Sequence, residues 1–133
     1  MDKSRTISFT IADIAFEYDE EKEKLNIQKH GISFRAAARV FFDEDYIEES
    51  DTTHSDDEQR YNVIGDTSAG NAAVYAAIGN VEKFFGDVND ILYVVYTERI
   101  RRESNGESYE VIRIISARLA NSFERGVYYG QYI

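Results

Sequence analysis

Residues 91–116, ILYVVYTERIRRESNGESYEVIRIIS, decide the fold. Two runs in this stretch, Ile91–Thr97 and Glu110–Ser116, are rich in valine, isoleucine and tyrosine, which favour β-strands. The polar segment Arg99–Ser108 lies between them and contains Asn105-Gly106, a pair that is typical of the turn in a β-hairpin. The stretch therefore predicts two antiparallel strands joined by a hairpin.

Three segments before this hairpin carry further strand patterns. Thr6–Ile11 alternates polar and apolar residues, which is the period of a strand with one buried face. Arg60–Ile64 also reads as a strand and is closed by Gly65, whereas Tyr46–Ser50 is a weaker candidate. The sequence thus predicts a sheet of mainly antiparallel strands.

The segment between the predicted strands Thr6–Ile11 and Tyr46–Ser50 carries the sequence signals of helices. Asp19 is a suitable N-cap for a helix over Glu20–His30, and Gly31 is a suitable residue to end that helix. Ser33 can cap a second helix over Phe34–Phe42, which has apolar residues at helical spacing along one face. Two short helices are therefore expected near the N-terminus.

A last helix is predicted over about Ser122–Tyr129, where Asn121 and Glu124 have the spacing of a capping box. The segment Asp66–Asp90 interrupts an expected turn between two strands. The spacing of its apolar residues favours an inserted helix over about Asn71–Phe85, and a third strand or a flexible flap is the alternative.

This order of elements predicts one α+β domain over residues 1–133. Residues 1–15 form an N-terminal extension with a strand, and residues 66–90 form an insertion. A hydrophobic content of 43% suits a globular domain, and the absence of cysteine excludes disulfides and thiolate-bound metal. The longest apolar run is too short to span a bilayer, so a cytoplasmic protein without a membrane partner is expected.

The charge is unevenly distributed along the chain. The net charge is −10, although proteins that bind nucleic acid usually carry the opposite sign. Residues 1–59 contain seven basic and sixteen acidic residues, whereas residues 91–133 contain six basic and five acidic residues. The acidic half either faces a basic protein partner or solvates the surface, and the arginines gather in the second half.

Cations at the ends of the predicted elements are the candidate functional residues. No phosphate-binding loop, zinc-protease motif, nucleophile elbow or calcium loop is present, and neither a metal nor another cofactor is expected. RNA cleavage without metal needs a base, an acid and cations for the phosphate oxygens. Histidine and arginine can supply these functions. The candidates are Lys29, His30, Arg60, Arg99, Arg113 and Arg118.

Several of the candidate residues can instead have purely structural roles. Lys29 and His30 can complement the C-terminal end of a helix, and Glu124 can act as a capping residue. Arg113 can be an exposed cation that pairs with Glu110.

Several motifs resemble the BrnT family of ribonuclease toxins. The first motifs are Phe16-Glu17-Tyr18-Asp19-Glu20-Glu21-Lys22, Asn26, Lys29–Phe34, and Ala37–Phe41 with Asp43. The next are Glu58-x-Arg60-Tyr61 and Ile64-Gly65. The most specific block comprises Val94–Arg99, Arg113–Arg118, Glu124-Arg125 and Tyr128. The resemblance runs from Phe16 to about Tyr128 and leaves out the insertion.

This resemblance implies a RelE-like fold, with two N-terminal helices and a C-terminal helix packed on a three- to five-stranded, mainly antiparallel sheet. It implies a metal-independent endoribonuclease toxin that slows translation by cutting RNA. The implied partner is a BrnA-like antitoxin, a ribbon-helix-helix protein through which the complex contacts DNA. Both a homodimer and a hetero-oligomer are compatible with this picture.

The family's functional positions can be carried onto this chain by the matching motifs. They imply proton transfer by His30 assisted by Lys29, and phosphate binding by Arg113 and Arg118. Arg60 and Arg99 are further substrate-binding candidates. The carboxylates Glu58 and Glu124 complete the candidate set.

An alternative is a protein-binding relative that keeps the fold and has lost useful catalysis. Tyr18 stands where the family commonly has tryptophan, and Leu119 stands where a further basic residue is usual. The ribonuclease predicts that His30, Arg113 and Arg118 converge in one open cationic cleft. The binding module allows them to be scattered or held in internal salt bridges.

Overall fold

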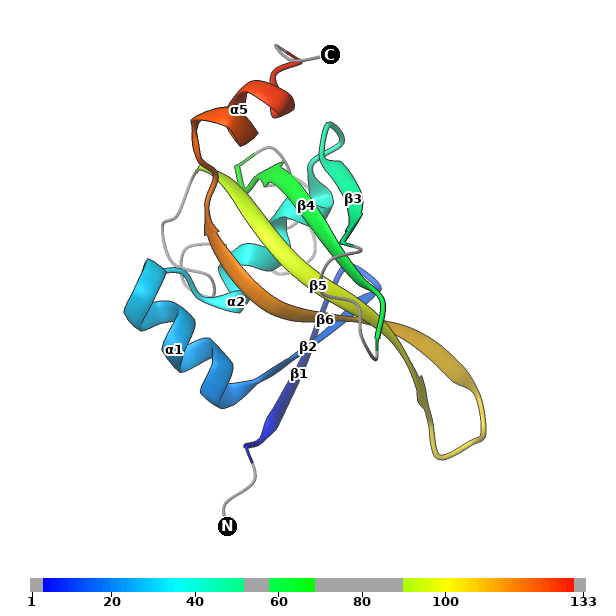
Figure 1. The fold of residues 1–133 in the computed structure, drawn as a ribbon. Helices are drawn as coiled ribbons and strands as arrows, with labels where there is room; N and C mark the ends of the chain where they lie inside the picture. The colour runs from blue at the N-terminus through cyan, green and yellow to red at the C-terminus, as the bar shows by residue number, and fades with distance from the viewer. Residues whose placement is uncertain (1–3, 52–57, 69–89, 131–133) are drawn as a thin grey trace.

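The computed structural model describes residues 4–51, 58–68 and 90–130 (Figure 1). The described elements follow one another as a group of strands, a group of helices, a second group of strands and a last helix, rather than as repeated βαβ units, as predicted. The elements in chain order are β1 (Thr6–Ile11), β2 (Ile14–Asp19), α1 (Glu20–His30), α2 (Phe34–Ala37), the 3₁₀ helix η1 (Ala38–Phe42), β3 (Ile47–Asp51), β4 (Arg60–Asp66), β5 (Ile91–Arg102), β6 (Ser108–Leu119) and α5 (Ser122–Tyr128).

The described strands form one six-stranded sheet in the order β1-β2-β6-β5-β4-β3. Neighbouring strands are antiparallel except β2 and β6, which are parallel. The predicted α+β class is therefore confirmed. The predicted number of three to five strands is wrong, because the sheet has six. The sheet is mainly antiparallel as predicted, but one parallel pair makes it mixed.

The additional strand is β2, which the sequence analysis did not predict. It pairs with β1 through a tight turn at Ala12 and Asp13, whose φ angles are 43° and 67°. Such left-handed turn residues are usually glycine or asparagine, so the ordinary hairpin signal is missing at this turn. Phe16 and Tyr18 are buried, and Glu17 lies between them in the strand.

Both N-terminal helices begin at their predicted residues, and the first also ends where predicted. Asp19 caps α1 by accepting a hydrogen bond from the Lys22 backbone, and Gly31 ends the helix with a φ of 70°. Ser33 caps the second helix at Ala36. That helix differs from the prediction, since α-helical geometry ends at Ala37 and η1 continues as a 3₁₀ helix.

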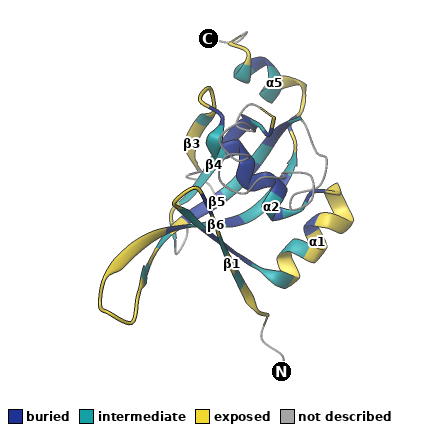
Figure 2. Cartoon of the chain, turned by 180° about the vertical axis from the view of Figure 1, so that it is seen from behind, coloured by how far each residue is buried: buried dark blue, intermediate teal, exposed yellow. Residues whose placement is uncertain are grey.

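The core lies between the sheet and the segment formed by α2 and η1 (Figure 2). Phe34 and Val40 on this segment, and Val63 and Val94 on the sheet, have no exposed surface. Gly65 sits where η1 approaches β4, because a Cβ atom there would lie 2.9 Å from the Val40 Cβ. The helical layer therefore covers one face of the sheet closely.

Helix α1 is anchored beside β6 by one buried asparagine. Strand β2 pairs with β6 over Val111–Ile114. Beyond these pairs, Asn26 Nδ2 donates to the Ala117 carbonyl at 2.8 Å, and Asn26 Oδ1 accepts from the Ala117 amide at 3.1 Å. The side chain of Asn26 thus continues the hydrogen bonding of the sheet edge where the strand partner ends.

The predicted hairpin of β5 and β6 is longer than expected, and its tip projects from the body of the molecule (Figure 1). At the other end of β5, Thr67 and Asp90 are bonded backbone to backbone at 3.0 Å, so the two ends of the predicted insertion meet. The helix predicted within this insertion, over residues 71–85, lies outside the described residues.

Helix α5 caps one end of the sheet, and its predicted capping box is confirmed. The Tyr128 hydroxyl donates to Asp43 at 2.6 Å and ties α5 to the segment after η1. Burial and the neighbouring Asp43 carboxylate raise the pKa of Tyr128, so its hydroxyl stays a donor. Among the described helices, none is long and apolar enough to cross a membrane.

Candidate functional site

The sheet face opposite α2 and η1 carries a row of polar residues. Strand register places Glu17 on β2 beside Arg113 on β6, Arg113 beside Thr97 on β5, and Thr97 beside Arg60 on β4. Side chains alternate between the two faces of a strand, so these residues share the face that α2 and η1 leave open. In the described ranges, this face carries most of the predicted arginines.

Glu17 lies at the β2 end of this row and is contacted by several arginines, although its side chain is only 3% exposed. One carboxylate oxygen, Oε1, accepts from Arg101 Nε at 2.9 Å. The other, Oε2, accepts from Arg101 Nη2 at 2.6 Å and from Arg113 Nη1, and it lies 4.0 Å from Arg99 Nη1. A buried carboxylate is tolerated when charged donors satisfy its oxygens, and here the guanidinium groups of the arginines are those donors.

Opposing effects act on the ionisation of Glu17. Burial alone raises the pKa of a carboxyl group, because it disfavours the charged form. The hydrogen bonds and charges of Arg101 and Arg113 outweigh burial, and the net result is a lowered pKa for Glu17. Glu17 is therefore ionised at neutral pH, and its charge offsets part of the repulsion between the arginines.

Arg99 is held by a second carboxylate. Its Nε and Nη2 donate to the two oxygens of Glu58 at 2.8 and 3.0 Å, which is the bidentate geometry of a strong ion pair. This hydrogen bonding lowers the pKa of Glu58. Thr97, on the same strand, donates to the Gln59 carbonyl at 2.6 Å and fixes the backbone beside Glu58.

Arg118 occupies a separate position toward the α5 end of the same strands. Its guanidinium carbon lies 4.2 Å from the centre of the Tyr93 ring, the residue opposite it on β5. Its two terminal nitrogens donate to Glu124 at 2.7 and 2.8 Å. Tyr93 and Thr97 are four residues apart, or about 13 Å along a strand. The sheet thus carries two cationic positions rather than one.

The predicted site residues are only partly brought together. Arg99 and Arg113 belong to the cluster around Glu17, and Glu58 is bound to Arg99. Arg60 lies in the same row, beside Thr97. Arg118 and Glu124 form the second position. Lys29 and His30 are exposed at the end of α1. Within the described parts of the chain, no hydrogen bond or ion pair joins either residue to these arginines. The pairing of Arg113 with Glu110 is not found, because Arg113 binds Glu17.

Two members of the cluster, Glu17 and Arg101, were missed by the sequence analysis. Arg101 lies two residues beyond Arg99, and Glu17 lies between the buried Phe16 and Tyr18. In a strand, alternation places Arg99 and Arg101 on one face. That signal was available, but it required β5 to extend to Arg102 and residues 14–19 to form a strand.

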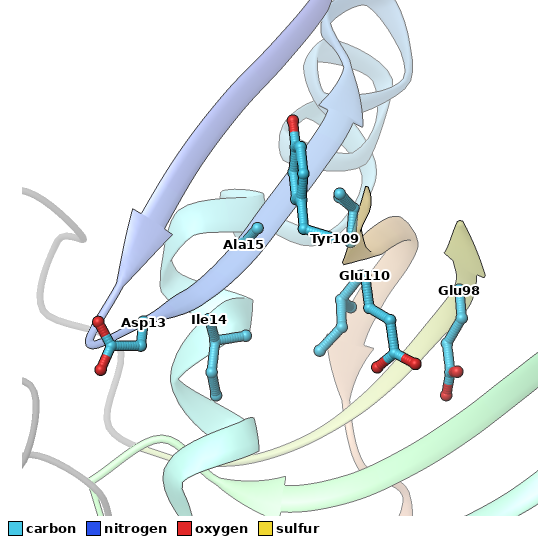
Figure 3. Close-up of a pocket in the computed structure, with 8 residues that line it drawn as sticks. Asp13, Ile14, Ala15, Glu98, Tyr109 and Glu110 are labelled. Atoms are coloured by element: carbon cyan, nitrogen blue, oxygen red, sulfur yellow. The ribbon is translucent and has the colours of Figure 1, made fainter. Parts of the chain in front are cut away.

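A pocket of about 470 Å³ lies near the turn between β1 and β2 (Figure 3). It is lined by Asp13, Ile14, Ala15, Glu98, Tyr109, Glu110, Val111 and Ile112. Its ionisable groups are carboxylates and a tyrosine, and none of its lining residues is basic. The pocket is therefore unsuited to phosphate, and the arginine cluster is the better candidate site. Within the described residues, no group of carboxylates and histidines has the arrangement of a metal site.

The Arg118–Glu124 pair predicts a pH-dependent contribution to stability. Burial raises the pKa of Glu124, but the hydrogen bonds from Arg118 and Asn121 lower it by more. The net shift of the pKa is therefore downward. A lowered pKa stabilises the folded protein above the ordinary carboxyl pKa, and this stabilisation is lost as the pH falls below it. Denaturant unfolding should therefore show Glu124→Gln less stable than wild type at pH 7, with the difference shrinking toward pH 3. Glu107→Gln at the exposed hairpin tip is the control and should be as stable as wild type at both pH values. A loss of stability in Glu124→Gln that is equal at pH 7 and pH 3 would contradict the prediction.

The fold and this surface define an α+β domain with clustered arginines on one sheet face, the kind of surface that binds phosphate groups. Residues 18–83 match the model of a known family, described as the ribonuclease toxin BrnT of type II toxin–antitoxin systems. The chain belongs to this family. A toxin of a type II system has an antitoxin partner. No curated protein matches the sequence.

The family match and the arginine cluster overlap in part. The matched region begins at Tyr18 and includes α1, the Lys29-His30 pair, Glu58 and Arg60. It ends before β5, so Arg99, Arg101 and Arg113 lie outside it. These three arginines are therefore candidates because of their geometry.

Proposed function

We propose that this protein is a metal-independent endoribonuclease toxin that inhibits translation by cleaving RNA. The observation that carries the proposal is the cluster of Arg99, Arg101 and Arg113 around Glu17 on the open sheet face, in a chain of a ribonuclease toxin family. Guanidinium groups are permanently charged and bind phosphate oxygens through paired N–H donors.

The proposed chemistry is transfer of the phosphate from the 5′-oxygen to the neighbouring 2′-oxygen of the RNA. A base removes the proton from the 2′-hydroxyl, and an acid protonates the departing 5′-oxygen. Arg99 and Arg113, with Arg60 on the other side of Thr97, would neutralise the charge that grows on the phosphate. Proton transfer by His30 and Lys29 requires the RNA to contact the end of α1 as well.

The proposed protein partner is a BrnA-like ribbon-helix-helix antitoxin, through which the complex would contact DNA. The excess of acidic residues in the first half of the chain supports a basic partner surface, since opposite charges accelerate association. The proposed location of both proteins is the cytoplasm, where the RNA substrate is found. A homodimer of the toxin or a toxin–antitoxin hetero-oligomer would fit this role.

A second candidate is a protein-binding member of the family with little or no catalysis. It is favoured by the ion pairs of Arg113 with Glu17 and of Arg118 with Glu124. It is also favoured by His30, which no described contact joins to either arginine. Arginines used in internal ion pairs must keep donors for RNA if the protein is an enzyme.

Expression in bacteria separates the two candidates. Induction of the wild-type protein should arrest growth and cause RNA fragments to accumulate, and the Arg113→Ala/Arg118→Ala variant should allow growth. The effect is expected because the double variant removes one guanidinium from each cationic position. The matched control is Arg5→Ala/Arg102→Ala, which removes two exposed arginines and should still arrest growth.

Purified protein provides the complementary measurement. Cleavage of RNA that persists with a chelator present would support the metal-independent reaction. Normal growth with soluble, folded wild-type protein and no cleavage would favour the binding module, and co-purification with the antitoxin would then test that role.

A further inference from the structure

We infer that Glu17 is the positioning residue of the phosphate site: its buried carboxylate holds Arg101 and Arg113 together so that both can bind one RNA phosphate. This inference rests on the proposed function and adds two residues, Glu17 and Arg101, to it. It assigns no chemical step to Glu17, which would act on the RNA through the arginines.

The contacts of Glu17 support this role. Its carboxylate receives hydrogen bonds from two guanidinium groups that belong to different strands, β5 and β6. Without a shared anion, two such groups repel each other and move apart. The Glu17 side chain is 3% exposed, whereas those of Arg101 and Arg113 are 41% and 16% exposed. An incoming phosphate therefore meets the arginines and not the carboxylate.

The arginines keep donors for a ligand. A guanidinium carries five N–H donors. In the described structure, Arg101 uses its Nε and Nη2 for Glu17, which leaves the Nη1 group available. Arg113 binds Glu17 through Nη1, and its Nε and Nη2 make no hydrogen bond to the described residues. Bidentate donation to a phosphate is therefore compatible with both ion pairs.

The position of Glu17 follows from the strand register. Phe16 and Tyr18 point into the core, which directs Glu17 to the open face. The parallel pairing of β2 with β6 then sets Glu17 beside Arg113. Arg99 completes the set, since Glu58 holds it within 4.0 Å of the same carboxylate. Three arginines thus surround one buried anion.

Two possible roles of Glu17 predict opposite results for Glu17→Gln: one in which only its negative charge matters, and one in which it positions the arginines. This change removes one negative charge near the arginines and would strengthen RNA binding if only the charge mattered. If Glu17 positions the arginines, binding should instead weaken by about tenfold, the loss expected when a charge-assisted hydrogen bond to the ligand is no longer made. Glu17→Asp keeps the charge on a shorter side chain and should recover part of the binding.

The experiment uses the full chain and a fluorescent, non-cleavable oligonucleotide with 2′-deoxy residues, titrated at several salt concentrations. The logarithm of the association constant decreases linearly with the logarithm of the salt concentration. For Glu17→Gln this negative slope should become shallower by about 0.7, the change for one lost contact to a single-strand phosphate. A purely structural role would lower the melting temperature and leave this slope unchanged. Glu20→Gln, which breaks the exposed pair with Arg5, is the matched control and should bind like wild type.

Tighter or unchanged binding by folded Glu17→Gln, with an unchanged slope, would overturn the inference. If Glu17→Gln does not fold, Arg101→Ala replaces it, because Arg101 is half-exposed and its loss leaves Glu17 paired with Arg113. An unchanged salt slope for Arg101→Ala would also overturn the inference. Wild-type protein that binds the oligonucleotide and fails to cleave RNA would contradict the proposed enzyme alone, since the binding comparison would still stand.

Discussion

Replacing Asn26 with alanine is expected to lower the free energy of unfolding by about 3 kcal/mol, because three backbone groups lose their partner. Asn26 donates to the carbonyls of Ile32 and Ala117 and accepts from the amide of Ala117. The residue is 6% exposed, so water has little access to the groups left behind. Each buried polar group without a partner costs about 1–3 kcal/mol.

Urea unfolding followed by circular dichroism measures this difference. Gln28→Ala is the matched control, because Gln28 is exposed on the same helix and makes no described side-chain hydrogen bond. Its free energy of unfolding should stay within about 0.5 kcal/mol of wild type. Equal midpoints for the two variants would mean that water satisfies the edge of β6 and that Asn26 does not anchor α1.

Much of the fold could be predicted because its signals are local. The caps of α1 at Asp19 and Gly31, and the capping box of α5, appear in the sequence and in the structure. The β5–β6 hairpin was predicted from its composition and from Asn105-Gly106. Strand β2 was missed because its turn lacks glycine and because its parallel partner, β6, lies almost one hundred residues away in the chain.

The candidate site could be predicted less well, because it depends on those distant pairings. Arg99 and Arg113 could be identified from the sequence, but their position near one carboxylate could not. Glu17 was quoted as part of a family motif, and its role follows from its pairing with β6. The catalytic assignment of His30 and Lys29 stays a prediction, since the described contacts do not connect these residues to the arginines.

Arg113→Ala is expected to lower kcat/KM for RNA cleavage by about a hundredfold, the usual cost of removing one preorganised donor from a transition state. Arg113 is central in the polar row, with Glu17 on one side and Thr97 on the other. Its side chain is 16% exposed, so an ion or water replaces it poorly. Single-turnover cleavage of a labelled RNA measures the effect.

Arg113→Lys separates charge from geometry in the same assay. Lysine keeps the positive charge, but its ammonium group cannot present the planar fork that binds Glu17 and a phosphate together. We therefore expect it to recover less than about a tenth of the lost activity. Arg102→Ala is the control, because it removes an exposed arginine from the same hairpin and should cleave like wild type. Wild-type cleavage by folded Arg113→Ala would place the chemistry elsewhere, and the position formed by Arg118 and Tyr93 would be the next to test.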